Sequence, residues 1–187
     1  MRDRTVQEYE AAALAFLRAG RHPRFDRLWP ALLYTPMREL TALLRRLDFT
    51  VYVVSGSSRD LLRTMAEPAY GVTREHVIGT EVEVVYRDGR LVRTGTLIPV
   101  DRGPGKPAHF WDRSGGQPLF AAGNTTGDLE LLEAARFGLL VDHDDAEREY
   151  AYADEDALAA ARSHGWTVAS MRDDFETVFA GTPVPLL

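Results

Sequence analysis

The feature that most constrains the fold is a repeated order of apolar run, polar loop and helix-forming segment. The first run is Phe49-Thr-Val-Tyr-Val-Val54, which is rich in β-branched and aromatic residues and stops at Ser55-Gly56-Ser57-Ser58. Such a run predicts a buried strand, and the segment that follows predicts a helix ended by Pro68. The order recurs in expected strands at 76–79, 118–122, 138–142 and 166–170 and expected helices at 107–112, 128–136 and 155–163. This alternation is typical of an α/β fold with a largely parallel sheet.

Two helices and a hairpin are expected outside this alternation. Thr5 and Glu8 have the spacing of a capping box, which predicts the start of a helix. Thr35 before Pro36 predicts the N-cap of a second helix. Asp88-Gly89 lies between two β-prone segments, as is typical of a tight hairpin turn.

Composition narrows the class of function. The 187 residues carry 22 Lys and Arg against 28 Asp and Glu, a net charge of −6, and the basic residues are scattered among acids, which disfavours nucleic-acid binding. There is no Cys, so thiolate nucleophiles and Cys-based metal sites are excluded and a cytoplasmic location is expected. No apolar stretch approaches the roughly 20 residues of a membrane span, so no membrane contact is expected.

Candidate functional residues follow the expected strands, because parallel sheets bind ligands beyond the carboxyl ends of their strands. They are Ser55 and the pair Asn124 and Asp128, which Lys106 joins from a Gly/Pro-rich loop. A hydroxyl, a lysine and turn oxygens suit a phosphorylated ligand and Mg²⁺. Each residue also has a structural interpretation: a turn serine, a solvated lysine, and an Asx turn with a helix cap.

A further polar run, Asp142-His143-Asp144-Asp145, follows the expected strand at 138–142. Successive residues cannot all face one ion, so a solvated charged loop is favoured over a metal cluster. Asp142 is the member that warrants a test for a role in the site.

Three segments in order resemble motifs two, three and four of the haloacid dehalogenase superfamily of phosphohydrolases. They read VVSGSS at 53–58, GPGKP at 103–107 and LFAAGNTTGDLELL at 119–132. The flanking segments YTPMREL, HVIGT and DAEREYAY are similar to those of a phosphoserine-phosphatase-like branch with the fourth motif GNSxxD. The resemblance covers about 5–179. It implies a Rossmann-like parallel sheet and Mg²⁺-dependent hydrolysis of a small phosphorylated metabolite.

The resemblance also implies the role of each candidate residue. Ser55 and Gly56 would bind the phosphoryl group, and Lys106 would stabilise that group and the carboxylate nucleophile. Asn124 stands where many relatives have a Mg²⁺-binding Asp, and Asp128 would be a direct or water-mediated ligand. These groups are expected to converge on one phosphoryl group.

One part of the family pattern is missing. The first motif, DxDxT, carries the aspartate that attacks phosphorus, and it does not occur in these 187 residues. Residues 1–33 would then be a partial helical cap, and residues 34–187 would be an α/β core that lacks its first, central strand. The strands ending at Ser55 and Ala122 would border a gap, which a homodimer partner or a companion chain could fill.

Three interpretations therefore remain open. The chain is a truncated phosphohydrolase whose nucleophile is encoded elsewhere, or a non-catalytic phosphate-binding or protein-interaction module that uses an open sheet edge, or an unstable fragment.

Overall fold

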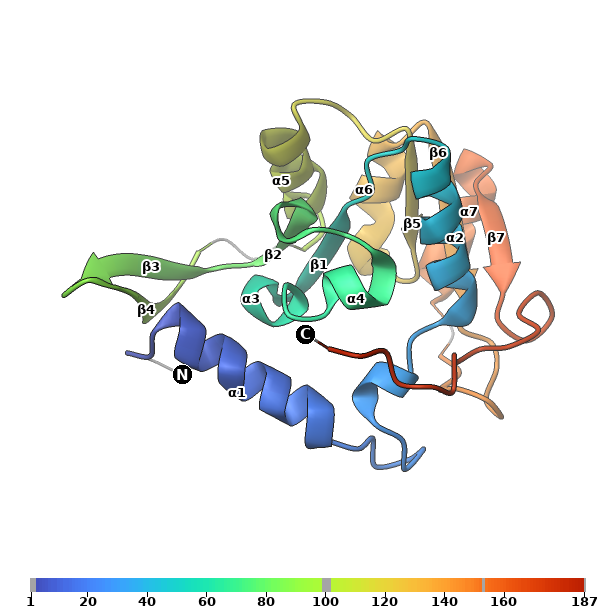
Figure 1. Ribbon diagram of the computed structural model, residues 1–187. Helices are drawn as coiled ribbons and strands as arrows, with labels where there is room; N and C mark the ends of the chain where they lie inside the picture. The colour runs from blue at the N-terminus through green and yellow to red at the C-terminus, as the bar shows by residue number, and fades with distance from the viewer. Residues whose placement is uncertain (1–2, 99–101, 153, 187) are drawn as a thin grey trace. The chain divides into compact units, whose positions relative to one another are not determined.

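The computed structural model describes residues 3–98, 102–152 and 154–186 (Figure 1). The chain forms two compact units, of which the first comprises Met1–Asp101 and Phe179–Leu187 and the second comprises Arg102–Val178. Each unit contains its own parallel sheet with helices packed on it. The predicted mixed α/β class with parallel strands is therefore confirmed.

The first unit combines helices, a two-stranded parallel sheet and an antiparallel hairpin. Its elements in chain order are α1 (Val6–Ala19), η1 (Trp29–Ala31), α2 (Thr35–Arg46), β1 (Val53–Ser58), α3 (Arg59–Leu62), α4 (Ala66–Tyr70), η2 (Arg74–His76), β2 (Val77–Thr80), β3 (Val82–Arg87) and β4 (Arg90–Leu97). β1 pairs in parallel with β2, from Val53 opposite Val77 onward, and α3 packs on both strands. Burial of Ala66, Val72 and Val77 builds one core of this unit.

Two local predictions in the first unit are confirmed. At the start of α1 the Thr5 hydroxyl accepts from the Glu8 amide at 3.1 Å, and the Glu8 carboxylate accepts from the Thr5 amide at 2.9 Å. In the turn between β3 and β4, Asp88 has φ 48° and Gly89 has φ 78°. Positive φ at both central residues is what a tight hairpin turn requires, and Asp and Gly tolerate it best.

Three boundaries differ from the sequence prediction. β1 begins at Val53 rather than at Phe49, because pairing with β2 begins there, and it continues past Ser55 through a bulge. Ser55 thus lies within the strand instead of following it. Pro68 lies in the first turn of α4 and does not end a helix, since an amide hydrogen is not needed there. Thr35 is the first residue of α2, Tyr34 is its N-cap, and the buried Thr35 hydroxyl has no partner among the described residues.

The second unit is a three-stranded parallel sheet with helices packed on it. Its elements are α5 (Gly105–Ser114), β5 (Phe120–Gly123), η3 (Thr126–Asp128), α6 (Leu129–Ala134), β6 (Phe137–Asp142), α7 (Glu155–His164) and β7 (Thr167–Ser170). The strand order is β5-β6-β7; α6 packs on β5 and β6, and α7 on β6 and β7. Leu132, Leu140 and Met171 are fully buried side chains of its core.

One further boundary differs from the sequence prediction. The helix predicted from residue 107 begins at Gly105, so Lys106 lies in its first turn rather than in a loop. The described parallel strands form two sheets, β1-β2 and β5-β6-β7, and this division does not contradict the expected lack of a central strand. Among the described residues β1 pairs only with β2, and β5 only with β6. The division at residues 33 and 34 into cap and core stays a prediction.

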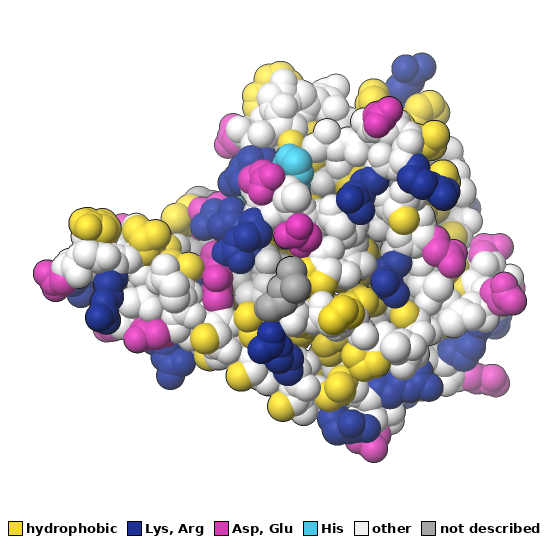
Figure 2. Space-filling model, in the orientation of Figure 1, with side chains coloured by type: hydrophobic (Ala, Val, Ile, Leu, Met, Phe, Trp, Pro, Cys, Tyr) yellow, Lys and Arg dark blue, Asp and Glu magenta, His cyan; other side chains and the backbone are white. Residues whose placement is uncertain are grey.

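The hairpin of the first unit exposes apolar side chains. Tyr86 is 77% exposed and Leu97 62% exposed, and Figure 2 shows hydrophobic side chains gathered on this hairpin, at the left. One edge of β4 is covered by the segment before α1, where Asp3 donates to the Arg93 carbonyl at 2.9 Å. No described helix has the length and apolar character needed to cross a bilayer.

Candidate functional site

The carboxyl ends of β5, β6 and β7 share one edge of the sheet in the second unit. Gly123 at the end of β5 lies opposite Leu140, and Asp142 at the end of β6 lies opposite Ser170 at the end of β7. Asn124 and His143 are the next residues after β5 and β6. Ligands of parallel sheets bind at this edge, so its polar side chains are the candidates for a functional site.

A buried ion pair joins α5 to the turn after β5. The Lys106 ammonium lies 2.5 Å from Asp128 Oδ1, and the two side chains are only 10% and 11% exposed. The other oxygen of Asp128 accepts from the amides of Asn124 at 2.9 Å and Thr125 at 3.2 Å. The backbone amides of the turn therefore hold one oxygen of the Asp128 carboxylate, and Lys106 binds the other.

Gly123 permits this arrangement. A Cβ at position 123 would lie 2.4 Å from the Cβ of Asp128, a distance that two carbon atoms cannot share without displacement. Thr125 caps the turn by accepting from the Gly127 amide at 3.3 Å. The sequence GNTTGD thus folds into a compact turn that presents one carboxylate and one amide side chain at the end of the strand.

The Asn124 side chain contacts a loop that follows β6. Its Nδ2 lies 3.2 Å from His143 Nε2 and also donates to the Tyr152 hydroxyl. His143 Nδ1 lies 3.3 Å from Glu149 Oε2, and its ring stacks on Tyr152 with centroids 4.6 Å apart. Burial raises the pKa of Tyr152, outweighing the opposite effect of its hydrogen bond with Asn124, so this phenol stays protonated at neutral pH.

The solvated loop predicted at 142–145 is wrong for two of its four residues. His143 and Asp145 are 5% and 4% exposed. The pKa of Asp142 is raised by burial and by the nearby Asp144 carboxylate. For Asp144, burial acts to raise the pKa, but hydrogen bonds from the Ser170 hydroxyl and the Arg172 amide outweigh it and lower the pKa. The loop is a folded part of the second unit.

Sequence reasoning missed Glu149 and Tyr152. The only sequence signal is their place in DAEREYAY, shortly after β6. The Tyr152 backbone amide donates to the His143 carbonyl at 3.0 Å and so closes the loop. The side chains of these two residues, nine positions apart, then both contact the side-chain amide of Asn124. That closure is a tertiary event without a periodic pattern in the sequence.

Two residue types occur only once in the chain, and both lie in this site. Lys106 is the only lysine, against 21 arginines, and Asn124 is the only asparagine. Every other Lys or Arg position in the sequence is an arginine. A lysine ammonium is a compact point charge, whereas a guanidinium is a wide planar fork, and Asp128 is paired with the former.

Ser55 and Gly56 belong to the first unit. The Ser55 hydroxyl accepts from the Ser57 amide at 3.2 Å, and the Gly56 carbonyl accepts from the Thr80 hydroxyl at 2.7 Å. The serine thus makes the local turn that its structural interpretation predicts, and among the described residues its hydroxyl donates no hydrogen bond. The convergence of Ser55 with Lys106 and Asp128 stays a prediction.

The described residues do not by themselves form a metal site. No three His, Asp or Glu side chains among them are grouped to hold an ion. The Mg²⁺ ligands predicted from the sequence, Asn124 and Asp128, offer one amide oxygen and one carboxylate that already accepts from Lys106 and two amides. Mg²⁺ requires an octahedron of oxygen ligands, so this pair is at most part of one.

The fold and site together define an α/β protein with charged side chains at the carboxyl ends of parallel strands. The sequence pattern of the haloacid dehalogenase-like hydrolases matches residues 1–133, and the chain belongs to this family. The family resemblance inferred from the three motifs is thereby confirmed. Members of this superfamily generally use Mg²⁺.

Solved structures share the fold at low sequence identity. A conserved functionally unknown protein from Anaerococcus prevotii DSM 20548 matches with a TM-score of 0.61 and 15% identity, over 98% of this chain and 55% of that one. A phosphoserine phosphohydrolase-like protein from Francisella tularensis subsp. tularensis SCHU S4 matches with a TM-score of 0.51 and 15% identity, over 89% of this chain and 73% of that one. The chain thus spans about half the length of the first of these proteins. Comparison with curated proteins gives no match.

Proposed function

We propose that the chain is the phosphoryl-binding part of a Mg²⁺-dependent phosphomonoester hydrolase that acts on a small phosphorylated metabolite. The observation that carries this proposal is the buried pair of Lys106 and Asp128 at the carboxyl edge of the sheet. A phosphate dianion is a natural ligand for a partly desolvated ammonium, because charge-assisted hydrogen bonds strengthen as water is removed. Family membership supports the same reaction class.

Each proposed role follows from chemistry at a matching motif position. The Lys106 ammonium would bind a phosphoryl oxygen, and its hydrogen bond to Asp128 would weaken in exchange. The Ser55 hydroxyl already accepts from Ser57, so its remaining hydrogen would be donated to phosphate, and the Gly56 amide would add a second donor. These assignments to Ser55 and Gly56 rest on the order of the sequence motifs.

The proposal assigns Asn124 and Asp128 to Mg²⁺, which when bound neutralises phosphoryl charge. The attacking carboxylate would come from outside the 187 residues, because no DxDxT occurs among them. Water and phosphoryl oxygens would complete the Mg²⁺ ligands. The proposal for this chain alone is therefore binding, with hydrolysis only after a companion chain supplies the carboxylate.

The single lysine allows a direct test of phosphate binding. Protein labelled with ¹³Cε-lysine gives one lysine side-chain NMR signal, from Lys106. Inorganic phosphate is expected to shift this signal in a saturable way, whereas sodium chloride at equal ionic strength leaves it in place. In the Asp128→Asn variant the competing carboxylate charge is gone, so saturation should occur at lower phosphate. A signal that moves equally with both salts contradicts the proposal.

A non-catalytic phosphate-binding module is the second candidate, favoured by the missing DxDxT sequence. It predicts saturable phosphate binding without turnover of p-nitrophenyl phosphate when Mg²⁺ is present. Turnover that disappears in the Asp128→Ala variant would exclude it.

A further inference from the structure

The donors and acceptors around Asn124 determine which end of its amide faces the protein. Glu149, as a carboxylate, can only accept, so His143 Nδ1 must carry a hydrogen across their 3.3 Å contact. Asn124 Nδ2 lies 3.2 Å from His143 Nε2, so the amide nitrogen is turned toward the loop. In the tautomer with its hydrogen on Nδ1, Nε2 has the lone pair that accepts from this amide.

The Tyr152 hydroxyl reinforces the same orientation. It accepts the second hydrogen of Asn124 Nδ2, and its ring stacks on His143 at an interplanar angle of 23°. Both amide hydrogens are then used. The amide oxygen of Asn124 accepts no hydrogen bond within the described ranges, which leaves it for an incoming cation or donor.

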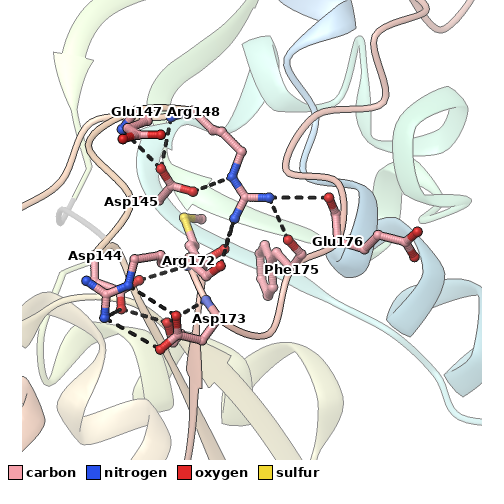
Figure 3. Close-up of polar contacts among 10 residues, drawn as sticks. Asp144, Asp145, Glu147, Arg148, Arg172, Asp173, Phe175 and Glu176 are labelled. Carbon is pink, nitrogen blue, oxygen red and sulfur yellow. Dashed lines mark hydrogen bonds and ion pairs between the residues drawn. The ribbon is translucent and has the colours of Figure 1, made fainter.

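An arginine clamp fixes the loop that carries His143 and Tyr152. Figure 3 shows the Arg148 guanidinium between Asp145 and the segment after β7. It donates to the carbonyls of Met171 at 2.8 Å and Phe175 at 2.7 Å. Asp145 in turn accepts from the Arg148 amide at 2.9 Å. The loop is thus anchored on the second unit's own backbone, and its two contacts to Asn124 are held in place.

We propose that His143 and Tyr152 are positioning residues that turn the Asn124 amide nitrogen inward and its oxygen toward the ligand, and that Arg148 holds their loop. Such outer contacts set the orientation of a ligating side chain and tune its affinity. The orientation of the Asn124 side chain does not depend on the proposed function. Only the identity of the ligand that binds its amide oxygen rests on the proposed function.

The orientation can be measured without any ligand, because Asn124 is the only asparagine. Protein labelled with ¹⁵N-asparagine gives one side-chain NH₂ pair, and both protons are expected to lie away from those of the exposed Gln7 and Gln117 amides. Tyr152→Phe removes one acceptor and should return one proton of the pair toward the exposed position. Tyr150→Phe removes a hydroxyl from the same loop and is the matched control, expected to leave the pair unchanged.

The tautomer of His143 provides an independent readout. Histidine ¹⁵N spectra at neutral pH should show a protonated Nδ1 and a bare Nε2, and Glu149→Gln should relax this preference because an amide can also donate. A hydrogen on Nε2 in the natural chain, or an Asn124 pair that Tyr152→Phe leaves unchanged, overturns the proposal.

Binding of Mn²⁺ alone separates this proposal from the proposed function. We expect Mn²⁺ to broaden the Asn124 signal and to bind about two- to tenfold more weakly to Tyr152→Phe than to Tyr150→Phe, as for the loss of one hydrogen bond. Equal affinities overturn the positioning role. If Mn²⁺ reaches neither protein while the NH₂ pair behaves as expected, the positioning role stands and the metal part of the proposed function fails.

Discussion

Replacing Lys106 by Arg keeps the charge and is expected to damage the site. The ammonium lies 2.5 Å from Asp128 in a place where both side chains are about nine-tenths buried. A wider guanidinium there forces neighbouring atoms apart, at a cost of about 1–3 kcal/mol for overpacking. Lys106→Met leaves the Asp128 carboxylate buried without its counter-charge, which costs about 3–5 kcal/mol.

A double-mutant cycle isolates the pair itself. In Lys106→Met with Asp128→Asn, the amide oxygen can still accept from the turn while no charge is left unpaired. We expect the double variant to be more stable than the sum of the single losses predicts, with a coupling above about 1 kcal/mol.

Urea unfolding followed by tryptophan fluorescence measures these free energies. Trp29→Phe in every variant restricts the signal to Trp111 and Trp166 of the second unit. The Trp29 indole nitrogen is buried without a partner among the described residues, so Phe loses no hydrogen bond there. A shifted midpoint at constant slope reports stability. If Lys106→Arg unfolds at the natural midpoint, or if the single losses simply add, the pair does not hold the site together and the reasoning is refuted.

Three other predictions concern the same unit. Gly123→Ala places a Cβ 2.4 Å from that of Asp128 and should destabilise by about 1–3 kcal/mol, whereas Gly116→Ala, with no atom within 4 Å, should not. Burial and Asp144 raise the pKa of Asp142, so ionisation opposes folding: Asp142→Asn should stabilise at neutral pH, with the gain vanishing in acid below the unfolded pKa. Hydrogen bonds from Arg148 lower the pKa of Asp145, so Asp145→Asn should destabilise at neutral pH and the loss should shrink as pH falls through the folded pKa; urea midpoints across pH check both signs.

Local patterns predicted most of the fold. The capping box at Thr5 and the turn at Asp88-Gly89 were found because short-range sterics and hydrogen bonds specify them. The start of β1 cannot be predicted from composition, since residues 49–52 have the composition of a strand but lack a pairing partner in β2. Strand ends are set by the neighbouring strand, which the sequence of one segment does not contain.

The candidate site shows the same division. Asn124 and Asp128 could be predicted because they follow an apolar strand on a glycine-rich turn. Glu149 and Tyr152 could not, because their approach to Asn124 depends on the closure of a loop and on a guanidinium bound to distant carbonyls. The sequence places His143 directly after a strand, but a run of charged neighbours does not indicate that its side chain is buried.

The Arg148 clamp has a consequence for proteolysis. The stretch 171–176 forms neither helix nor strand, and such stretches are usually where proteases cut first. Here the Arg148 side chain donates hydrogen bonds to four backbone carbonyls. These bonds must break before the stretch can bind in the active site of a protease. Trypsin or thermolysin should therefore pass over it in the natural chain, and Arg148→Lys, which lacks the branched donors, should turn it into an early cleavage point.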